Sequence, residues 1–159
     1  EIDYANLTAI DKWILDKENT LIKAVDKLYE DYELGEVARL IYNFTWNDFA
    51  SWYIELTKVS LNNPKYSINT CAVLKHVLID ILKLLHPFMP FVTEEIYSAL
   101  VTEEESLMIS KWPEYKEEWN FAKEEAARLA AAGRSVAIIS RDNCRKALVG
   151  ENVEKDNYL

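Results

Sequence analysis

The sequence predicts an all-α protein, an antiparallel bundle of four to five helices followed by a C-terminal tail of undefined structure. Among its 159 residues are only three glycines, whereas strand-rich folds use glycine at many turns. Long segments repeat apolar residues at spacings of three and four, which is typical of amphipathic helices. Half of the residues are hydrophobic, so one helical domain can bury a sizeable core.

The first helix is expected from about Thr8 to Tyr32. Thr8 is a suitable N-cap, and Asp11 at the third helical position completes a capping box. Lys17 and Glu18 interrupt the apolar face. That face comprises Ile10, Trp13, Ile14, Leu21, Val25 and Leu28. The segment YELGE is expected to close this helix and to open the next.

The second helix is expected from about Glu36 to Leu61, with apolar residues on two nearly opposite sides. One side comprises Val37, Ile41, Phe44, Trp52 and Val59, and the other comprises Tyr42, Trp46, Phe49 and Tyr53. This pattern fits a central helix that is buried on both sides. It equally fits a helix with a partly open aromatic face, which would suit stacking on unpaired bases.

The third helix is expected from about Ile68 to Leu85. Its inward face would comprise Cys71, Leu74, Leu78, Ile81, Leu82 and Leu85. His76 is expected on the exposed side, and no residue at metal-ligand spacing pairs with it. We therefore expect no metal site.

The stretch LLHPFMPFVTEEIYSAL, residues 84–100, predicts a tight corner between two helices. Pro87 pushes the preceding residue out of helical geometry and so ends the third helix. Pro90 suits the first turn of a new helix. His86 is expected to make a structural hydrogen bond rather than to act in acid–base catalysis. The apolar side chains expected to plug the corner are Phe88, Met89 and Phe91.

The sequence divides into a helical domain, residues 1–121, and a tail, residues 122–159. Within the tail, the pattern indicates a helix that ends at Gly133 and a short strand-like run from Val136 to Ile139.

Composition excludes several classes of function. The net charge of −9 disfavours a domain that binds nucleic acid by itself, because such affinity rests mainly on neutralised phosphates. No apolar run approaches the roughly 20 residues needed to cross a bilayer, so no membrane contact is expected. Neither a glycine-rich phosphate loop nor a nucleophile–base pair occurs, so no catalytic site and no cofactor are expected in this chain.

Four stretches, in the correct order, resemble the helical anticodon-binding domain of class I aminoacyl-tRNA synthetases. They are DKWIL at 11–15, YNFTWNDFASWYIELTK at 42–58, LKLLHPFMPFVTEEIY at 82–97 and ESLMISKWPEY at 105–115. The second and the fourth favour the valyl type over the isoleucyl and leucyl types. The resemblance covers roughly residues 3–120. It departs from the family at 18–22, where ENTLI stands in place of Leu-Asn-Glu-Thr-Ile.

The resemblance implies that the chain is a fragment of a cytoplasmic, monomeric valine–tRNA ligase. The parent enzyme would join valine to its tRNA for protein synthesis and would use ATP. The family's His-x-Gly-His and Lys-Met-Ser-Lys-Ser signatures are absent here. Catalysis and editing would therefore belong to other domains of the parent chain, which are implied partners. This fragment would recognise the anticodon stem-loop.

Helix geometry and the resemblance together single out six residues for contact with the anticodon loop of valine tRNA. They are Arg39, Asn43, Trp46, Asn47, Phe49 and Lys58. The two aromatic rings are expected to stack on bases, and the two asparagines to hydrogen-bond base edges. The two basic side chains are expected to contact phosphate or base.

Two alternatives remain open. The chain is an acidic helical scaffold for protein partners, or it is the equivalent domain of an isoleucyl- or leucyl-tRNA synthetase.

Overall fold

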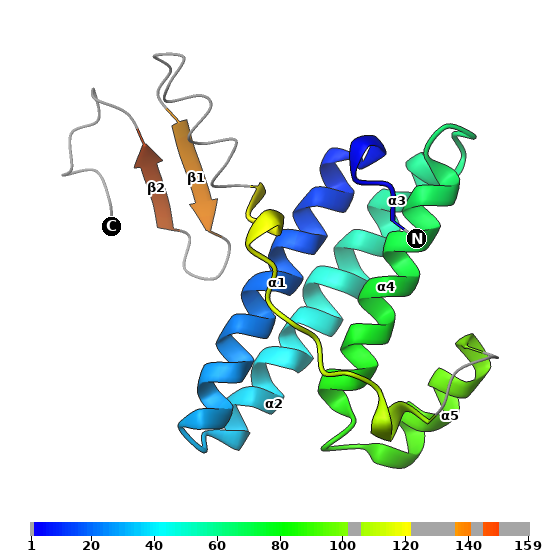
Figure 1. Cartoon of the computed structure of the whole chain (residues 1–159). Coiled ribbons are helices and arrows are strands. Elements are labelled where there is room, and N and C mark those ends of the chain that lie inside the picture. Colours follow the sequence, from blue (N-terminus) through cyan, green and yellow to red (C-terminus); the bar gives the residue numbers. More distant parts are fainter. Residues whose placement is uncertain (1, 102–105, 122–135, 141–144, 150–159) are drawn as a thin grey trace. The chain divides into compact units, whose positions relative to one another are not determined.

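A computed structural model of the chain describes residues 2–101, 106–121, 136–140 and 145–149 (Figure 1). The chain divides into two compact units, Glu1–Trp119 and Asn120–Leu159. No helix in the described ranges is both long and apolar enough to span a membrane.

The first unit is a bundle of helices, as the sequence predicts. Its α-helices are α1 (Ala9–Glu30), α2 (Leu34–Asn43), α3 (Ile54–Leu61), α4 (Ser67–Leu85) and α5 (Pro90–Leu100). A π-helical segment, η2 (Phe44–Tyr53), joins α2 to α3, and short 3₁₀ turns lie at η1 (Tyr4–Asn6), η3 (Leu107–Ile109) and η4 (Glu117–Trp119). Helices α1, α2 and α4 lie side by side, and α5 packs at one end (Figure 1).

Helix α1 ends at Glu30, and the residue that turns the chain after it is Tyr32 rather than a glycine. Tyr32 has a φ of 59°, which places a bulky residue in the left-handed region that usually favours glycine. The Glu33 N–H donates to the Leu28 carbonyl at 2.9 Å, and the Tyr32 N–H to the Tyr29 carbonyl at 3.1 Å. These two bonds form a Schellman motif. Gly35, which the sequence analysis assigned to the helix boundary, lies inside α2.

The long second helix contains an extra residue in its buried face. Its backbone stays helical from α2 through η2 into α3, but η2 has the i→i+5 pattern of a π-helix. At the junction the Ile54 N–H donates to the Phe49 carbonyl. The buried residues run Val37, Ile41, Phe44, Phe49, Tyr53, Thr57 and Ser60. An unbroken α-helix would instead turn Asp48 and Glu55 toward the core.

This shift corrects the expected faces. Trp52 and Val59, which were assigned to the inner side, are 51% and 77% exposed. Of the second aromatic face, Tyr42 and Trp46 are exposed, whereas Phe49 and Tyr53 are buried. The buried face therefore combines the first part of one expected face, through Phe44, with the last part of the other, from Phe49.

Asp11 is the hydrogen-bonding centre of the bundle. The predicted capping box with Thr8 is present, and the Asp11 carboxylate is fully buried. Its Oδ1 accepts the Tyr53 hydroxyl at 2.7 Å, and its Oδ2 accepts the Thr70 hydroxyl at 3.2 Å. Thr8 donates to the same Oδ2 through its hydroxyl and its backbone N–H. One side chain thus joins the start of α1 to η2 and α4.

The buried face of α4 is rotated from the expected one and is partly polar. It comprises Asn69, Thr70, Val73, Val77, Asp80, Ile81, Leu82 and Leu84. Cys71, expected to point inward, is exposed. The prediction chose a face shifted around the helix because it counted only apolar residues as core. Thr70 and Asp80, which are polar, are nevertheless buried.

After α5, residues 106–119 run back along α1 in the opposite direction (yellow in Figure 1). The Trp112 indole N–H donates to Asp26 at 3.0 Å. Asn19 accepts the Lys116 backbone N–H and donates its amide to the Lys116 carbonyl, both at 2.7 Å. Trp119 then ends the segment 1% exposed. Asn19 is therefore the side chain of α1 that holds this segment.

The second unit contains a two-stranded antiparallel sheet. Strand β1 (Val136–Ser140) pairs with β2 (Arg145–Val149), and Val136 lies opposite Val149. The helix expected before Gly133 lies outside the described residues.

Removing the Tyr53 hydroxyl tests the Asp11 centre. We expect Tyr53→Phe to lower the free energy of unfolding by about 1.5–3 kcal/mol, because a buried carboxylate loses a charge-assisted hydrogen bond. The exposed Tyr42 on the same long helix provides the control Tyr42→Phe, for which little change is expected. Urea denaturation measures both. Equal effects of the two substitutions would show that Asp11 does not depend on Tyr53.

Alanine substitutions on the buried and the exposed face of η2 test whether the π-helical segment shifts the buried positions. Phe49→Ala is expected to cost about 3–5 kcal/mol of stability, because a buried ring is lost. Trp46→Ala is expected to cost about 0.5 kcal/mol or less, since that ring is exposed. An unbroken α-helix would not separate the two positions in this way. A larger loss for Trp46→Ala would contradict the π-helical register.

Candidate nucleic-acid interface

The six residues expected to contact RNA divide into exposed and buried groups. Arg39, Trp46, Asn47 and Lys58 are exposed, Asn43 is partly exposed and Phe49 is buried. The Phe49 ring is 6% exposed and lies 6.0 Å from the Tyr53 ring, centroid to centroid. Phe49 is thus a core residue, and the expectation that it stacks on a base was wrong. The extra residue in η2 turns it inward.

Five residues form an exposed surface across the junction of α2 and η2, which we call the tryptophan surface. They are Arg39, Tyr42, Asn43, Trp46 and Asn47. Spacings of three and four place them along one side of the helix up to the π-helical segment. Tyr42 and Trp46 are 63% and 61% exposed. Lys58 lies in α3, several turns beyond, and is not part of this surface.

Both basic candidates hold an acidic neighbour on their own helix. Arg39 pairs with Glu36 at 2.7 Å, and Lys58 pairs with Glu55 at 2.6 Å. All four side chains are at least half exposed. Exposed pairs of this kind contribute only about 0.2–1 kcal/mol. Exchanging the carboxylate for a phosphate would therefore cost little.

The backbone beneath Trp46 is held by a side chain. The Ser51 hydroxyl donates to the Trp46 carbonyl at 2.7 Å, across the five-residue separation of the π-helical segment. Segments of this kind are frequent at functional sites, where they change the direction of a side chain. Here the spacing of buried residues lengthens to five between Phe44 and Phe49. The Trp46 ring therefore stays exposed, whereas Phe49 faces the core.

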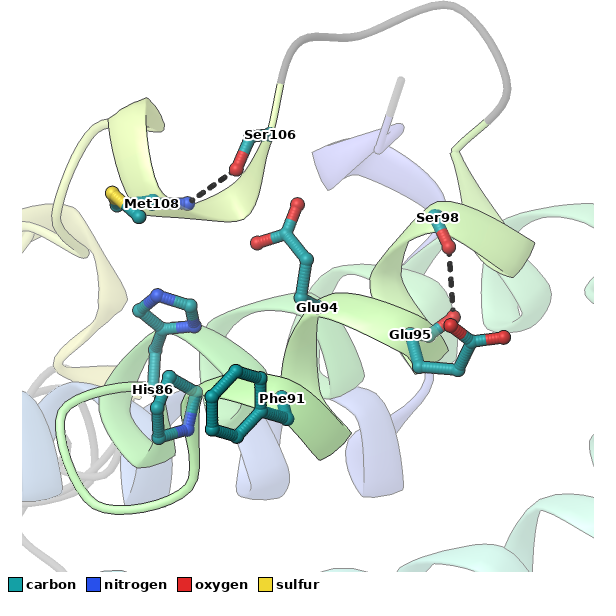
Figure 2. A pocket seen from close by; sticks show the side chains of 8 residues that line it. His86, Phe91, Glu94, Glu95, Ser98, Ser106 and Met108 are labelled. Carbon is teal, nitrogen blue, oxygen red and sulfur yellow. Dashed lines mark hydrogen bonds between the residues drawn. The ribbon is translucent and has the colours of Figure 1, made fainter.

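A pocket lies at the corner between α4 and α5 (Figure 2). Its cavity is about 440 Å³ and is lined by His86, Pro90, Phe91, Glu94, Glu95, Ser98, Ser106 and Met108. The helix end at Leu85 and the start at Pro90 are confirmed, but the expectation that Pro87 pushes His86 out of helical geometry was wrong, since His86 has φ −54° and ψ −41°. The three expected plugs are instead exposed, with Phe91 at 89%, because the corner lies at the end of the bundle.

Hydrogen bonds hold the polar groups of this corner in structural roles. His86 Nδ1 lies 2.8 Å from the Thr93 hydroxyl, which donates to the Met89 carbonyl. Glu94 Oε1 accepts the Leu107 N–H at 3.0 Å, and in Figure 2 its carboxylate faces the turn that contains Ser106. Hydrogen bonds from Ser106 and from the Leu107 and Met108 backbone lower the pKa of Glu94. Glu94 is therefore an ionised cap of η3.

A third group of polar side chains lies inside the bundle and was missed by the sequence analysis. His76 is not freely exposed, since its side chain is 27% accessible and lies 3.6 Å from Asp80 Oδ2. Its Nε2 also lies 3.9 Å from Glu18 Oε2. Burial first, and then the charge of Asp80, raise the pKa of Glu18 well above its usual range. Burial lowers the pKa of His76. The four-residue spacing of His76 and Asp80 was the signal that could have found the pair.

Known proteins give the family context of this arrangement. The sequence model of the family described as the anticodon-binding domain of tRNA ligase matches residues 11–148. Valine–tRNA ligase of Listeria innocua is 48% identical over 130 residues, which is 80% of this chain and 15% of the ligase. Valine–tRNA ligase of Staphylococcus haemolyticus is 45% identical over 118 residues, 73% of this chain and 14% of the ligase. The chain thus spans only 14–15% of the length of these curated relatives.

Neutralising Glu94 tests the corner. Its folded pKa lies below the ordinary value of 4.5, so its stabilising contribution is present above that value and is lost as the pH falls through the folded pKa. We expect Glu94→Gln to lower the urea midpoint at neutral pH, with a difference from wild type that disappears in acid. Glu95→Gln, on the neighbouring exposed side chain, is the control. A pH-independent difference would contradict an ionised cap.

Proposed function

The chain belongs to the family of anticodon-binding domains of tRNA ligases, and we propose that it binds the anticodon loop of valine tRNA within a valine–tRNA ligase. The relatives named above, which are valine–tRNA ligases, support the choice of tRNA. The exposed Trp46 ring on the tryptophan surface carries the proposal for the contact site.

The tryptophan surface has the chemistry that single-stranded loop bases require. Trp46 and Tyr42 present large rings to solvent, and such rings stack on unpaired bases at about 1–3 kcal/mol per base. Asn43 and Asn47 flank Trp46 on the same side of the helix, with amides that donate to and accept from base edges. Stacking would supply affinity, and the amides would supply base selectivity.

Arg39 and Lys58 would contact the RNA backbone. Their carboxylate partners are exposed and close at hand, so a phosphate oxygen can replace them with little loss. The net charge of −9 opposes binding of a polyanion at long range. We therefore expect the isolated chain to bind RNA weakly, and the remainder of the ligase to supply most phosphate contacts.

The reaction itself would take place elsewhere in the ligase. The parent enzyme would use ATP to join valine to its tRNA, in the cytoplasm and as a monomer. The domain proposed here would hold the anticodon end of the tRNA, and so place the acceptor end in a distant active site. Editing of wrongly attached amino acids would likewise belong to another domain.

Truncating Trp46 in the full-length ligase tests the contact site. We expect Trp46→Ala to weaken binding of valine tRNA by about 1–3 kcal/mol, the value of one base stack, with the urea midpoint almost unchanged. The measurement is the affinity for valine tRNA and for the same tRNA with a mutated anticodon. Discrimination between the two should shrink.

The control is Phe91→Ala, which removes another exposed aromatic ring, at the corner between α4 and α5. It should leave discrimination between the tRNAs intact. If Trp46→Ala leaves a folded ligase that distinguishes the two tRNAs as well as wild type does, Trp46 is not a base reader. Arg39, Asn43 and Asn47 would then be the remaining candidates on this surface.

A further inference from the structure

We propose that Glu18, His76 and Asp80 bind one divalent transition-metal ion of the zinc type between α1 and α4. His76 and Asp80 lie one turn apart on α4, and Glu18 faces them from α1. One ligand atom from each side chain lies within 4.8 Å of the other two. The ion would link the two helices inside the bundle, away from the tryptophan surface.

The distances suit such an ion after a small contraction. His76 Nε2 lies 3.6 Å from Asp80 Oδ2 and 3.9 Å from Glu18 Oε2. A tetrahedral ion bound at roughly 2.0–2.2 Å separates its ligand atoms by roughly 3.4 Å. Both distances are thus within about 0.5 Å of the separation that such an ion requires.

The lack of hydrogen-bond partners on Glu18 is the second, independent observation. Glu18 is 1% exposed, and within the described residues neither of its carboxylate oxygens has a hydrogen-bond partner. His76 Nε2 is also buried without one. Buried polar groups are normally paired, and an isolated pair of carboxylate oxygens in a core is rare. A bound cation would satisfy His76 Nε2 and one carboxylate oxygen of Glu18.

The neighbouring charged groups leave the ligand atoms accessible to the ion. Lys83 lies 3.5 Å from Asp80 Oδ1, the oxygen that does not face His76. Lys116 Nζ lies 3.8 Å from the centroid of the Trp119 ring. That ring packs edge-to-face on His76, with ring centroids 5.3 Å apart. Residues 106–119, which end at Trp119, therefore cover one side of the site.

The donor set indicates the class of ion. One imidazole nitrogen and two carboxylate oxygens suit zinc, manganese or iron(II), whereas calcium and magnesium prefer oxygen ligands alone. Three protein ligands leave one position open for water. Because Glu18 is almost fully buried and the Trp119 ring packs on His76, we assign the ion a structural role.

Metal titration of the whole chain tests the site without RNA, so that its outcome is independent of the proposed function. Protein stripped with a chelator would be titrated with zinc chloride and examined by native mass spectrometry and thermal denaturation. We expect one ion per chain and a raised melting temperature. His76→Gln should weaken binding at least about tenfold, since even outer-sphere partners of metal ligands change affinity by that factor.

The control is His86→Gln, which removes the other of the two histidines and should leave binding unchanged. Glu18→Gln provides a second ligand variant in case His76→Gln does not fold. Failure of the wild-type chain to bind a stoichiometric ion would overturn the proposal. So would binding that survives both ligand substitutions, because the ion would then lie elsewhere.

Discussion

The hydrogen bond between the Tyr53 hydroxyl and the buried Asp11 carboxylate is the constraint on which the bundle depends. Asp11 already caps α1 through Thr8 and accepts the Thr70 hydroxyl of α4, so Tyr53 completes a link between three helical segments. Burial and the bond to Asp11 raise the pKa of Tyr53, which keeps the hydroxyl protonated as a donor. A buried carboxylate is tolerated only when its oxygens are satisfied, and here four donors satisfy them.

Tyr53 reaches Asp11 because η2 adds one residue to the buried face of the long helix. With unbroken α-helical spacing, Asp48 would occupy the inward position that Phe49 fills. The same extra residue leaves Trp46 and Asn47 exposed between the buried Phe44 and Phe49. The core requirement and the exposed tryptophan surface are thus two results of one local change in helix geometry, which explains why a π-helical segment lies at the proposed RNA contact.

Polar residues in the core account for the other differences between the expected and the observed structure. Asn19 is buried because its amide matches both backbone groups of Lys116. Glu18 of α1 is buried beside His76 and Asp80 of α4. Each of these residues looks like a break in an apolar stripe. Asn19 and Glu18 each lie instead beside a partner that is far away in the sequence.

The sequence by itself determined the helical class, the capping box at Thr8, the Pro87–Pro90 corner and the family, because these depend on neighbouring residues and on short motifs. It left open whether the aromatic side of the second helix is core or exposed, and the structure exposes Arg39, Trp46 and Asn47. Only the tertiary structure decided that Phe49 is core, that α4 is rotated, and that Glu18 meets His76 and Asp80. Apolar periodicity assumes a constant helical repeat and an apolar core. A π-helical segment breaks the first assumption, and hydrogen bonds between distant residues break the second.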